Sequence, residues 1–263
     1  MRKQLHVSGM KLLFNCGEAW RRRYLEGQRI APNAALHTGS AVHKGIEINV
    51  GTKIETGELG DKDEIVEVAR DYAVDRIDSE GITLEEGQTE DQAKAEVIDN
   101  TVNLTALHCD EVAPKLQPLS VERSFCIDMN GFPFDLAGQF DIEEADVMRD
   151  TKTARRKPPQ RSVEDNIQTD AYYFAKQVLD GEYPHAFKFD YLVKGKTPKY
   201  HVLSTGRTEE EVQMFLRRYE TACQIIENEV FVPAPTDHWM CNEKWCGYFA
   251  DCPFARRTDR PSG

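Results

Sequence analysis

The sequence predicts an α/β fold with a mixed β-sheet flanked by helices. Helical patterns fill the first 115 or so residues, and alternating strand-like segments begin near residue 120. A helical segment over 163–179 then separates two groups of strands, and such a crossover can return the chain parallel to an earlier strand. With 263 residues, 40% of them hydrophobic, the chain can bury a sizeable core.

The first half of the chain is predicted to be mainly helical. Ser8 can begin a helix over about residues 9–26, and a second helix over 39–50 places His43 and Glu47 on one side. The acidic stretch 51–100 is predicted as helices interrupted by glycine-containing loops at 57–60 and 81–87. Helix should continue to about Val112, because Pro114 follows.

The second half is predicted to contain the sheet. Residues 120–129 and 132–144 alternate around an Asn130-Gly131 turn, and 145–153 forms the next strand. After the crossover helix, 187–195 and 199–206 form a second hairpin, and a long helix covers about 208–229. We expect one domain over 1–263, with a helical part at 1–115, a sheet core at 116–206, and a helix plus cysteine-rich tail at 207–263.

Charge is distributed in blocks. The formal net charge is −12, but residues 51–100 alone hold sixteen acidic and five basic residues. Residues 149–161 hold six basic residues and one acid, Asp150. A nucleic-acid surface needs a local positive field rather than a positive total, although each block can also be an ordinary solvated face.

No segment indicates a membrane or secretory protein. The sequence has no run of 18 apolar residues and no apolar leader followed by a cleavage site. We therefore expect a cytoplasmic protein whose thiols stay reduced.

An acidic and basic pair in the third strand suggests a metal site. Asp150 and Lys152 are two residues apart, so they point to the same side of a strand. A tight turn over 143–146 would bring Asp141 close to Asp150, and two close carboxylates repel unless a cation lies between them. Oxygen ligands favour Mg²⁺ or Mn²⁺. The alternative is a surface ion pair that contributes little.

Four motifs in chain order resemble the PD-(D/E)XK nuclease superfamily. They are His43 in GSAVHKGIE, Gly138-x-x-Asp141, Asp150-x-Lys152 and Gln168-x-x-x-Tyr172. They are most similar to the RecB-like branch, which includes CRISPR-associated adaptation nucleases and phage exonucleases. The resemblance implies a restriction-endonuclease-like core.

The resemblance also implies a role for each residue. His43, Asp141, Asp150 and the Thr151 carbonyl would hold Mg²⁺ or Mn²⁺. Lys152 would orient the attacking water and stabilise charge on the phosphate. Gln168 and Tyr172 would position the substrate or Lys152. Four nearby basic residues are expected either to contact phosphates or to lie on a solvated surface: Arg155, Arg156, Lys157 and Arg161.

Three cysteines lie within twelve residues of the tail: Cys241, Cys246 and Cys252. In a reducing compartment this spacing points to a metal, either zinc or an iron–sulfur cluster. The resemblance implies that Cys16 is the fourth ligand of a structural [4Fe–4S] cluster. Cys109, Cys126 and Cys223 are predicted to be core thiols. We expect five aromatic residues to pack around the metal: Trp239, Trp245, Tyr248, Phe249 and Phe254.

The expected function is a divalent-metal-dependent DNA exonuclease that acts on single strands or DNA ends, as in recombination or repair. Two alternatives share the fold, namely a structure-selective endonuclease and a non-catalytic DNA-binding or assembly module. A third is an interaction protein that carries zinc or a cluster. The sequence indicates no protein partner or oligomeric state.

Overall fold

The computed structural model describes residues 3–255, which form two compact units. Unit 1 contains the residues up to Ile30, Asp128–Ala137, and those from Gln213 onward. Unit 2 contains Ala31–Ile127 and Gly138–Val212. Within the described part, no helix is both long and apolar enough to cross a bilayer.

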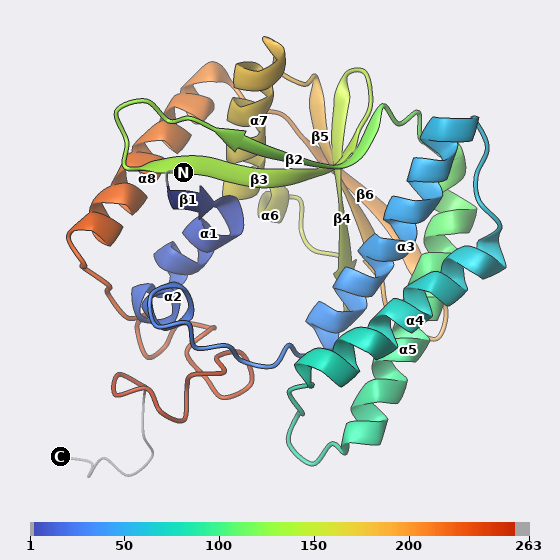
Figure 1. Cartoon of the computed structure of the whole chain (residues 1–263), viewed down its shortest axis with the longest axis horizontal. Coiled ribbons are helices and arrows are strands. Elements are labelled where there is room, and N and C mark those ends of the chain that lie inside the picture. Colours follow the sequence, from blue (N-terminus) through green and yellow to red (C-terminus); the bar gives the residue numbers. More distant parts are fainter. Residues whose placement is uncertain (1–2, 256–263) are drawn as a thin grey trace. The chain divides into compact units, whose positions relative to one another are not determined.

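Unit 2 begins with three helices that lie side by side (Figure 1). They are α3 (Ala34–Thr56), α4 (Lys62–Glu80) and α5 (Glu90–Leu107). Asn33, Asp61 and Thr89 cap their first turns through side-chain oxygens. Gly57, with φ of 83°, ends α3, and Gly81 ends α4. The predicted loops are confirmed, and α5 is followed by a π-helical turn at His108–Val112 and a 3₁₀ turn at Ala113–Lys115.

The sheet of unit 2 is mixed, as the sequence predicts. Its strands are β2 (Ser120–Ile127), β3 (Phe134–Glu143, in this unit from Gly138), β4 (Val147–Ala154), β5 (Ala186–Val193) and β6 (Lys199–Thr205). The order is β3-β4-β5-β6, with β2 paired to β3. The β3–β4 and β5–β6 pairs are antiparallel, whereas β4 and β5 are parallel. The crossover between β4 and β5 consists of α6 (Arg161–Glu164) and α7 (Ile167–Asp180).

Helices flank this sheet. Ile142 of β3 and Leu192 of β5 are buried in one cluster with apolar residues of α3 and α5. Tyr172 of α7 packs instead against Phe140 and Phe187. Phe187 and Leu192 are five residues apart on β5 and therefore point to opposite faces. The helices α3 and α5 thus cover one face and α7 the other. The candidate active-site residues belong to α3, β3, β4 and α7.

Unit 1 joins the two ends of the described chain. Strand β1 (Lys3–His6) runs parallel to the first residues of β3, with Lys3 paired to Phe134. Helices α1 (Val7–Asn15) and α2 (Gly17–Tyr24) follow, and α8 (Glu209–Glu227) belongs to this unit from Gln213 onward. The Gly17 amide donates to the Val232 carbonyl at 2.8 Å, and a Cβ on Gly17 would lie 2.8 Å from the Val232 nitrogen.

The prediction of one continuous helix over 9–26 is wrong at Cys16. This residue is extended, with φ of −161°, and it separates α1 from α2. Its amide still donates to Leu12 O, while its sulfur accepts the Ala19 amide at 3.5 Å and caps α2. The break follows from contacts with the distant C-terminal segment, which local helical spacing does not encode.

Candidate active site and cysteine pocket

Asp150, Lys152 and Gln168 meet on one side of β4. The Lys152 ammonium lies 2.8 Å from Asp150 Oδ1 and 2.7 Å from Oδ2. Gln168, at the start of α7, donates from Nε2 to Asp150 Oδ1 at 2.6 Å. Arg149 points away and contacts Glu144 and the buried Asp190 at 2.6 and 3.0 Å. The alternation of β4 therefore places Arg149 on the opposite side of the strand from Asp150 and Lys152.

His43, Asp141 and Thr151 complete the group. The turn at 144–147 closes the β3–β4 hairpin, and the ladder pairs Ile142 with Arg149. Just beyond that pair, the Thr151 amide donates to Asp141 Oδ2 at 3.0 Å. His43 of α3 lies with Nδ1 3.5 Å from Asp141 Oδ2 and Nε2 2.8 Å from Thr151 O. Two carboxylates, a carbonyl and an imidazole thus converge within unit 2.

Tyr172 supports the site from α7. It follows Gln168 by one helical turn, and its hydroxyl interacts with the Gln168 side chain. Its ring contacts Phe125, Phe140 and Phe187, and only 6% of the residue is exposed. Burial, together with the Asp150 charge, raises the pKa of Tyr172, so the phenol is neutral at physiological pH. It can therefore orient Gln168 as a neutral hydrogen-bonding group.

Burial and closely spaced carboxylates shift the pKa values of the residues in the site. Burial and the neighbouring Asp150 carboxylate raise the pKa of Asp141 to about 7. Burial opposes the charged form of His43, but Asp141, Glu122 and Asp150 outweigh it and raise its pKa to about 9. Burial also opposes the charged form of Lys152, but the Asp150 carboxylate outweighs it and raises the pKa of Lys152. In the metal-free protein, protons and the Lys152 ammonium thus compensate a concentration of negative charge.

The structure adds Glu122, which the sequence analysis did not identify. Its Oε1 lies 3.3 Å from His43 Nδ1. Glu122, His43 and Asp141 form a group whose ligand atoms all lie within 4.8 Å of one another. Within the sequence SVERSF, nothing distinguishes Glu122 from an ordinary strand residue. Its position beside His43 follows only from the packing of β2 near α3. Glu47, which the sequence places on the same side of the helix as His43, pairs with Lys44 at 2.9 Å.

The donor set fits a hard divalent cation. Two carboxylates and a backbone carbonyl supply oxygen, and His43 supplies nitrogen, a combination that Mg²⁺ and Mn²⁺ accept. Burial and, after it, repulsion from the Asp150 carboxylate raise the pKa of Asp141, so its negative charge is unfavourable without a cation. A bound ion would relieve that repulsion.

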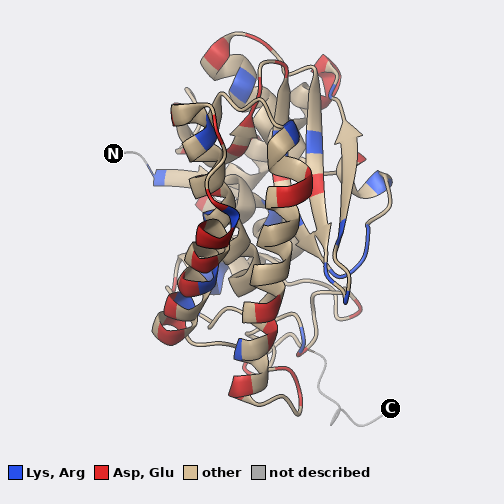
Figure 2. Ribbon diagram, turned by 90° about the vertical axis from the view of Figure 1, so that its right-hand side faces the viewer, with Lys and Arg blue, Asp and Glu red and all other residues tan. Residues whose placement is uncertain are grey.

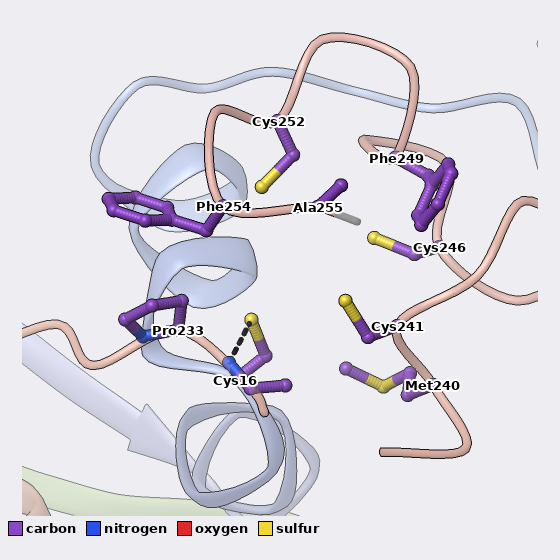
Figure 3. Close-up of a pocket in the computed structure, with 10 residues that line it drawn as sticks. Cys16, Pro233, Met240, Cys241, Cys246, Phe249, Cys252, Phe254 and Ala255 are labelled. Atoms are coloured by element: carbon purple, nitrogen blue, oxygen red, sulfur yellow. Dashed lines mark hydrogen bonds between the residues drawn. The ribbon is translucent and has the colours of Figure 1, made fainter. Parts of the chain in front are cut away.

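The four cysteines Cys16, Cys241, Cys246 and Cys252 line one pocket of unit 1. Figure 3 shows their sulfurs directed into the same space, with Phe249 and Phe254 at its edge. The Cys16 sulfur accepts the Ala234 amide at 3.3 Å. Burial, with smaller contributions from neighbouring cysteines, raises the pKa of Cys241 and Cys246, as expected for thiols held without a metal.

Two of the sequence predictions about the cysteine-rich region are wrong. Cys109 and Cys223 are buried as expected, but Cys126 is exposed because it lies on the outward side of β2. Trp239 and Trp245 do not line the pocket and are 59% and 50% exposed, although their rings contact each other. Tyr248 is also not a pocket residue, and its hydroxyl donates to Gln28 O at 2.8 Å.

A mixed sheet that carries adjacent acids and a lysine, flanked by helices, is the kind of core found in nucleases. The chain belongs to the PD-(D/E)XK nuclease superfamily, whose family model matches residues 4–257. This confirms the superfamily and the α/β fold that the sequence predicts.

One solved structure agrees on the fold. A candidate exonuclease from Eubacterium rectale superposes with a TM-score of 0.61 at 16% identity, covering 99% of this chain and 91% of that one. The structure of SSO0001 gives a TM-score of 0.41 at 12% identity, covering 88% and 90%. No curated protein matches the sequence.

Proposed function

We propose that the chain is a divalent-metal-dependent deoxyribonuclease that acts as a single nuclease domain. The observation that carries this proposal is the convergence of Asp141, Asp150, His43 and the Thr151 carbonyl beside the Lys152 ammonium. These four groups would hold Mg²⁺ or Mn²⁺. The bound ion would polarise the scissile phosphate and lower the pKa of a coordinated water.

The chain's own residues supply the remaining functions. Because Asp150 and Asp141 raise the pKa of Lys152, this side chain stays charged and can stabilise negative charge on the phosphate oxygens. Gln168 holds the Asp150 carboxylate through the 2.6 Å hydrogen bond, and Tyr172 braces Gln168. The arrangement suits hydrolysis of a phosphodiester bond.

We propose an exonuclease that acts on single strands or DNA ends. The resemblance to the RecB-like branch favours it, and the Eubacterium rectale protein with this fold carries the name of an exonuclease. The sharp test is digestion of end-labelled single-stranded, duplex and circular single-stranded DNA with Mn²⁺. Shortening from one end supports the proposal, whereas cutting of circles identifies an endonuclease.

Matched variants decide whether the proposed residues cause the cleavage. Lys152→Ala and Asp150→Asn should strongly reduce digestion while DNA binding remains, and Lys62→Ala, at an exposed lysine of α4, should leave both unchanged. A wild-type chain that binds DNA but cuts none would be a non-catalytic module.

We propose that substrate phosphates beyond the scissile one contact a basic surface at the ends of β4 and β5. Ala154 pairs with Val193 where the two parallel strands end, and the Lys194 amide donates to Ala154 O at 2.8 Å. The residues that follow bring six cations together: Arg155, Arg156, Lys157, Lys194, Lys196 and Lys199. Figure 2 shows these basic segments beside each other.

The basic surface lies close to the catalytic group. Lys152 is only two residues before Ala154 on β4, and all six cations except Lys194 are exposed. Arg155 also pairs with Glu85 at 3.1 Å, but this contact is exposed and adds little. Replacing Lys196 and Lys199 by Gln should weaken single-strand binding and reduce the salt slope by roughly 0.7 per lost phosphate contact. Lys62→Gln with Lys94→Gln is the control pair.

We propose that the four pocket cysteines hold a [4Fe–4S] cluster that fastens residue 16 to the C-terminal segment. The Ala19 and Ala234 amides that point at the Cys16 sulfur would stabilise a thiolate there. Zinc accepts the same four thiolates and is the alternative.

Metal analysis of anaerobically purified protein tests the cluster. We expect iron and sulfide rather than zinc, with both lost in Cys246→Ser and retained in Cys126→Ser, at an exposed cysteine outside the pocket. Stoichiometric zinc in the wild-type protein would overturn the cluster but keep the structural role.

A further inference from the structure

Glu122 has a backbone conformation that a strand residue rarely adopts. Its φ is 50°, in the left-handed region, and Glu229 is the one other non-glycine residue of the described chain with positive φ. Side chains with a Cβ disfavour this region, and such strain persists where surrounding structure enforces it. The flanking residues take up fixed contacts, because Val121 packs against a core cluster and Arg123 contacts Glu143 at 2.5 Å.

Strand β3, which carries the metal-site motif, contacts this strained backbone. Gln139, between Gly138 and Asp141, donates from Nε2 to the Glu122 carbonyl at 3.0 Å. The resulting conformation brings the Glu122 carboxylate to 3.3 Å from His43 Nδ1. The strain therefore coincides with a contact to a residue of the proposed metal site rather than with a turn or a helix end.

The two nitrogens of His43 face different acceptors. Nδ1 faces Glu122 and, at 3.5 Å, Asp141, whereas Nε2 lies 2.8 Å from the Thr151 carbonyl. A histidine that binds a metal through one nitrogen commonly donates the other N–H to a carboxylate, which fixes the tautomer and the ring orientation. If Nδ1–H is donated to Glu122, Nε2 beside the Thr151 carbonyl is the nitrogen left for the ion.

We propose that Glu122 is a positioning residue for the metal site. It accepts the Nδ1–H of His43 and so holds this imidazole with Nε2 unprotonated and directed towards the cation beside the Thr151 carbonyl. The strained backbone of Glu122 is the cost of bringing the carboxylate to that nitrogen. The inference rests on the proposed nuclease function but makes its own prediction about metal binding.

The variant Glu122→Gly distinguishes the effect of the carboxylate from the effect of the strained backbone. Glu122→Gly removes the side chain while relaxing the left-handed backbone, so the thermal midpoint should stay level or rise. Mn²⁺ affinity, measured by electron paramagnetic resonance of the free ion, should fall about 10- to 100-fold. A residue that only supports the fold would not combine weaker metal binding with undiminished stability. Glu229→Gly is the matched control, with the same backbone relief and unchanged Mn²⁺ affinity.

A second variant tests positioning against direct ligation. The amide oxygen of Glu122→Gln can still accept the Nδ1–H, so its Mn²⁺ affinity should stay nearer to wild type than that of Glu122→Gly. Equal losses in both variants would make Glu122 a ligand and overturn the proposal. Nitrogen-15 spectra of the His43 ring with Mg²⁺ should show the Nδ1–H tautomer in the wild type and its loss in Glu122→Gly.

The outcomes distinguish this inference from the proposed function. If Glu122→Gly binds Mn²⁺ as tightly as the wild-type protein, the role of Glu122 is overturned but the proposed function is not. Wild-type protein that binds no Mn²⁺ overturns the metal site and this inference with it. DNA cleavage is not needed for either result.

Discussion

Gly138 is predicted to be irreplaceable because an aromatic ring occupies the space of its side chain. A Cβ at this position would lie 2.5 Å from Phe125 Cζ and 2.8 Å from Cε1. The ring has little freedom to move, since its centroid is 4.6 Å from that of Phe140 and 5.8 Å from that of Tyr172. Gly138→Ala therefore forces a displacement in a buried aromatic cluster.

The magnitude follows from overpacking. Inserting one methyl group into a tightly packed core costs about 1–3 kcal/mol. For a chain of this size, each kcal/mol lowers the thermal midpoint by about 2–4 °C, so Gly138→Ala should melt roughly 2–12 °C below wild type. Since Tyr172 follows Gln168 on α7, the displacement should also reduce nuclease activity.

Thermal and urea denaturation followed by circular dichroism measure this effect. Gly51→Ala is the control, because its Cβ would meet nothing nearer than 3.9 Å and the residue lies inside α3. That substitution should stabilise the protein by about 0.5–1 kcal/mol. Adding Phe125→Leu to Gly138→Ala should cost less than the sum of the two single changes. The steric argument fails if Gly138→Ala is as stable as wild type or if the two changes are additive.

Three further predictions follow from the charged groups. The stability of the metal-free protein should fall as pH rises from about 4 to 9: Asp141, with a pKa raised from 3.8 to about 7, and His43, raised from 6.5 to about 9, both bind more protons when folded. Mn²⁺ should raise the melting temperature more at pH 8 than at pH 6. In Asp141→Asn, stability should depend less on pH than in the wild type, and an unchanged pH dependence would contradict the prediction. Arg149→Met should destabilise the protein by about 3–5 kcal/mol in urea titrations, because it leaves the buried Asp190 carboxylate without its cation and with only the Tyr200 hydroxyl as a side-chain partner. Unchanged stability would show that the ion pair is dispensable. Lys152→Ala should lower kcat about 10²- to 10³-fold with little change in DNA affinity, whereas a loss confined to affinity would make Lys152 a binding residue.

Local patterns were enough to predict much of unit 2. The glycine-containing loops separate α3, α4 and α5 as predicted, although α3 is longer than the predicted helix over 39–50, and alternation around short turns predicts the strands. The spacing of Asp150 and Lys152 places both on one side of β4, and that of Gln168 and Tyr172 places both on one side of α7. Each of these relations depends on neighbours in the chain, which is why the sequence carries it.

Other features depend on partners far away in the sequence. Strand β1 has only four residues and exists because it pairs with β3, about 130 residues later. Cys16 interrupts the first helix because it contacts the segment around Ala234. The left-handed φ of Glu122 coincides with a hydrogen bond from Gln139 of β3 and has no local signal.

The sequence by itself determined the order of helices and strands and which catalytic-type side chains share a face, because those relations span one turn or two strand residues. Tertiary structure alone decided which nitrogen of His43 faces the acids, which carboxylate supports it, and that four cysteines share one pocket. The physical reason is that a hydrogen bond or a shared pocket depends on distances of a few ångströms between segments that no local pattern relates.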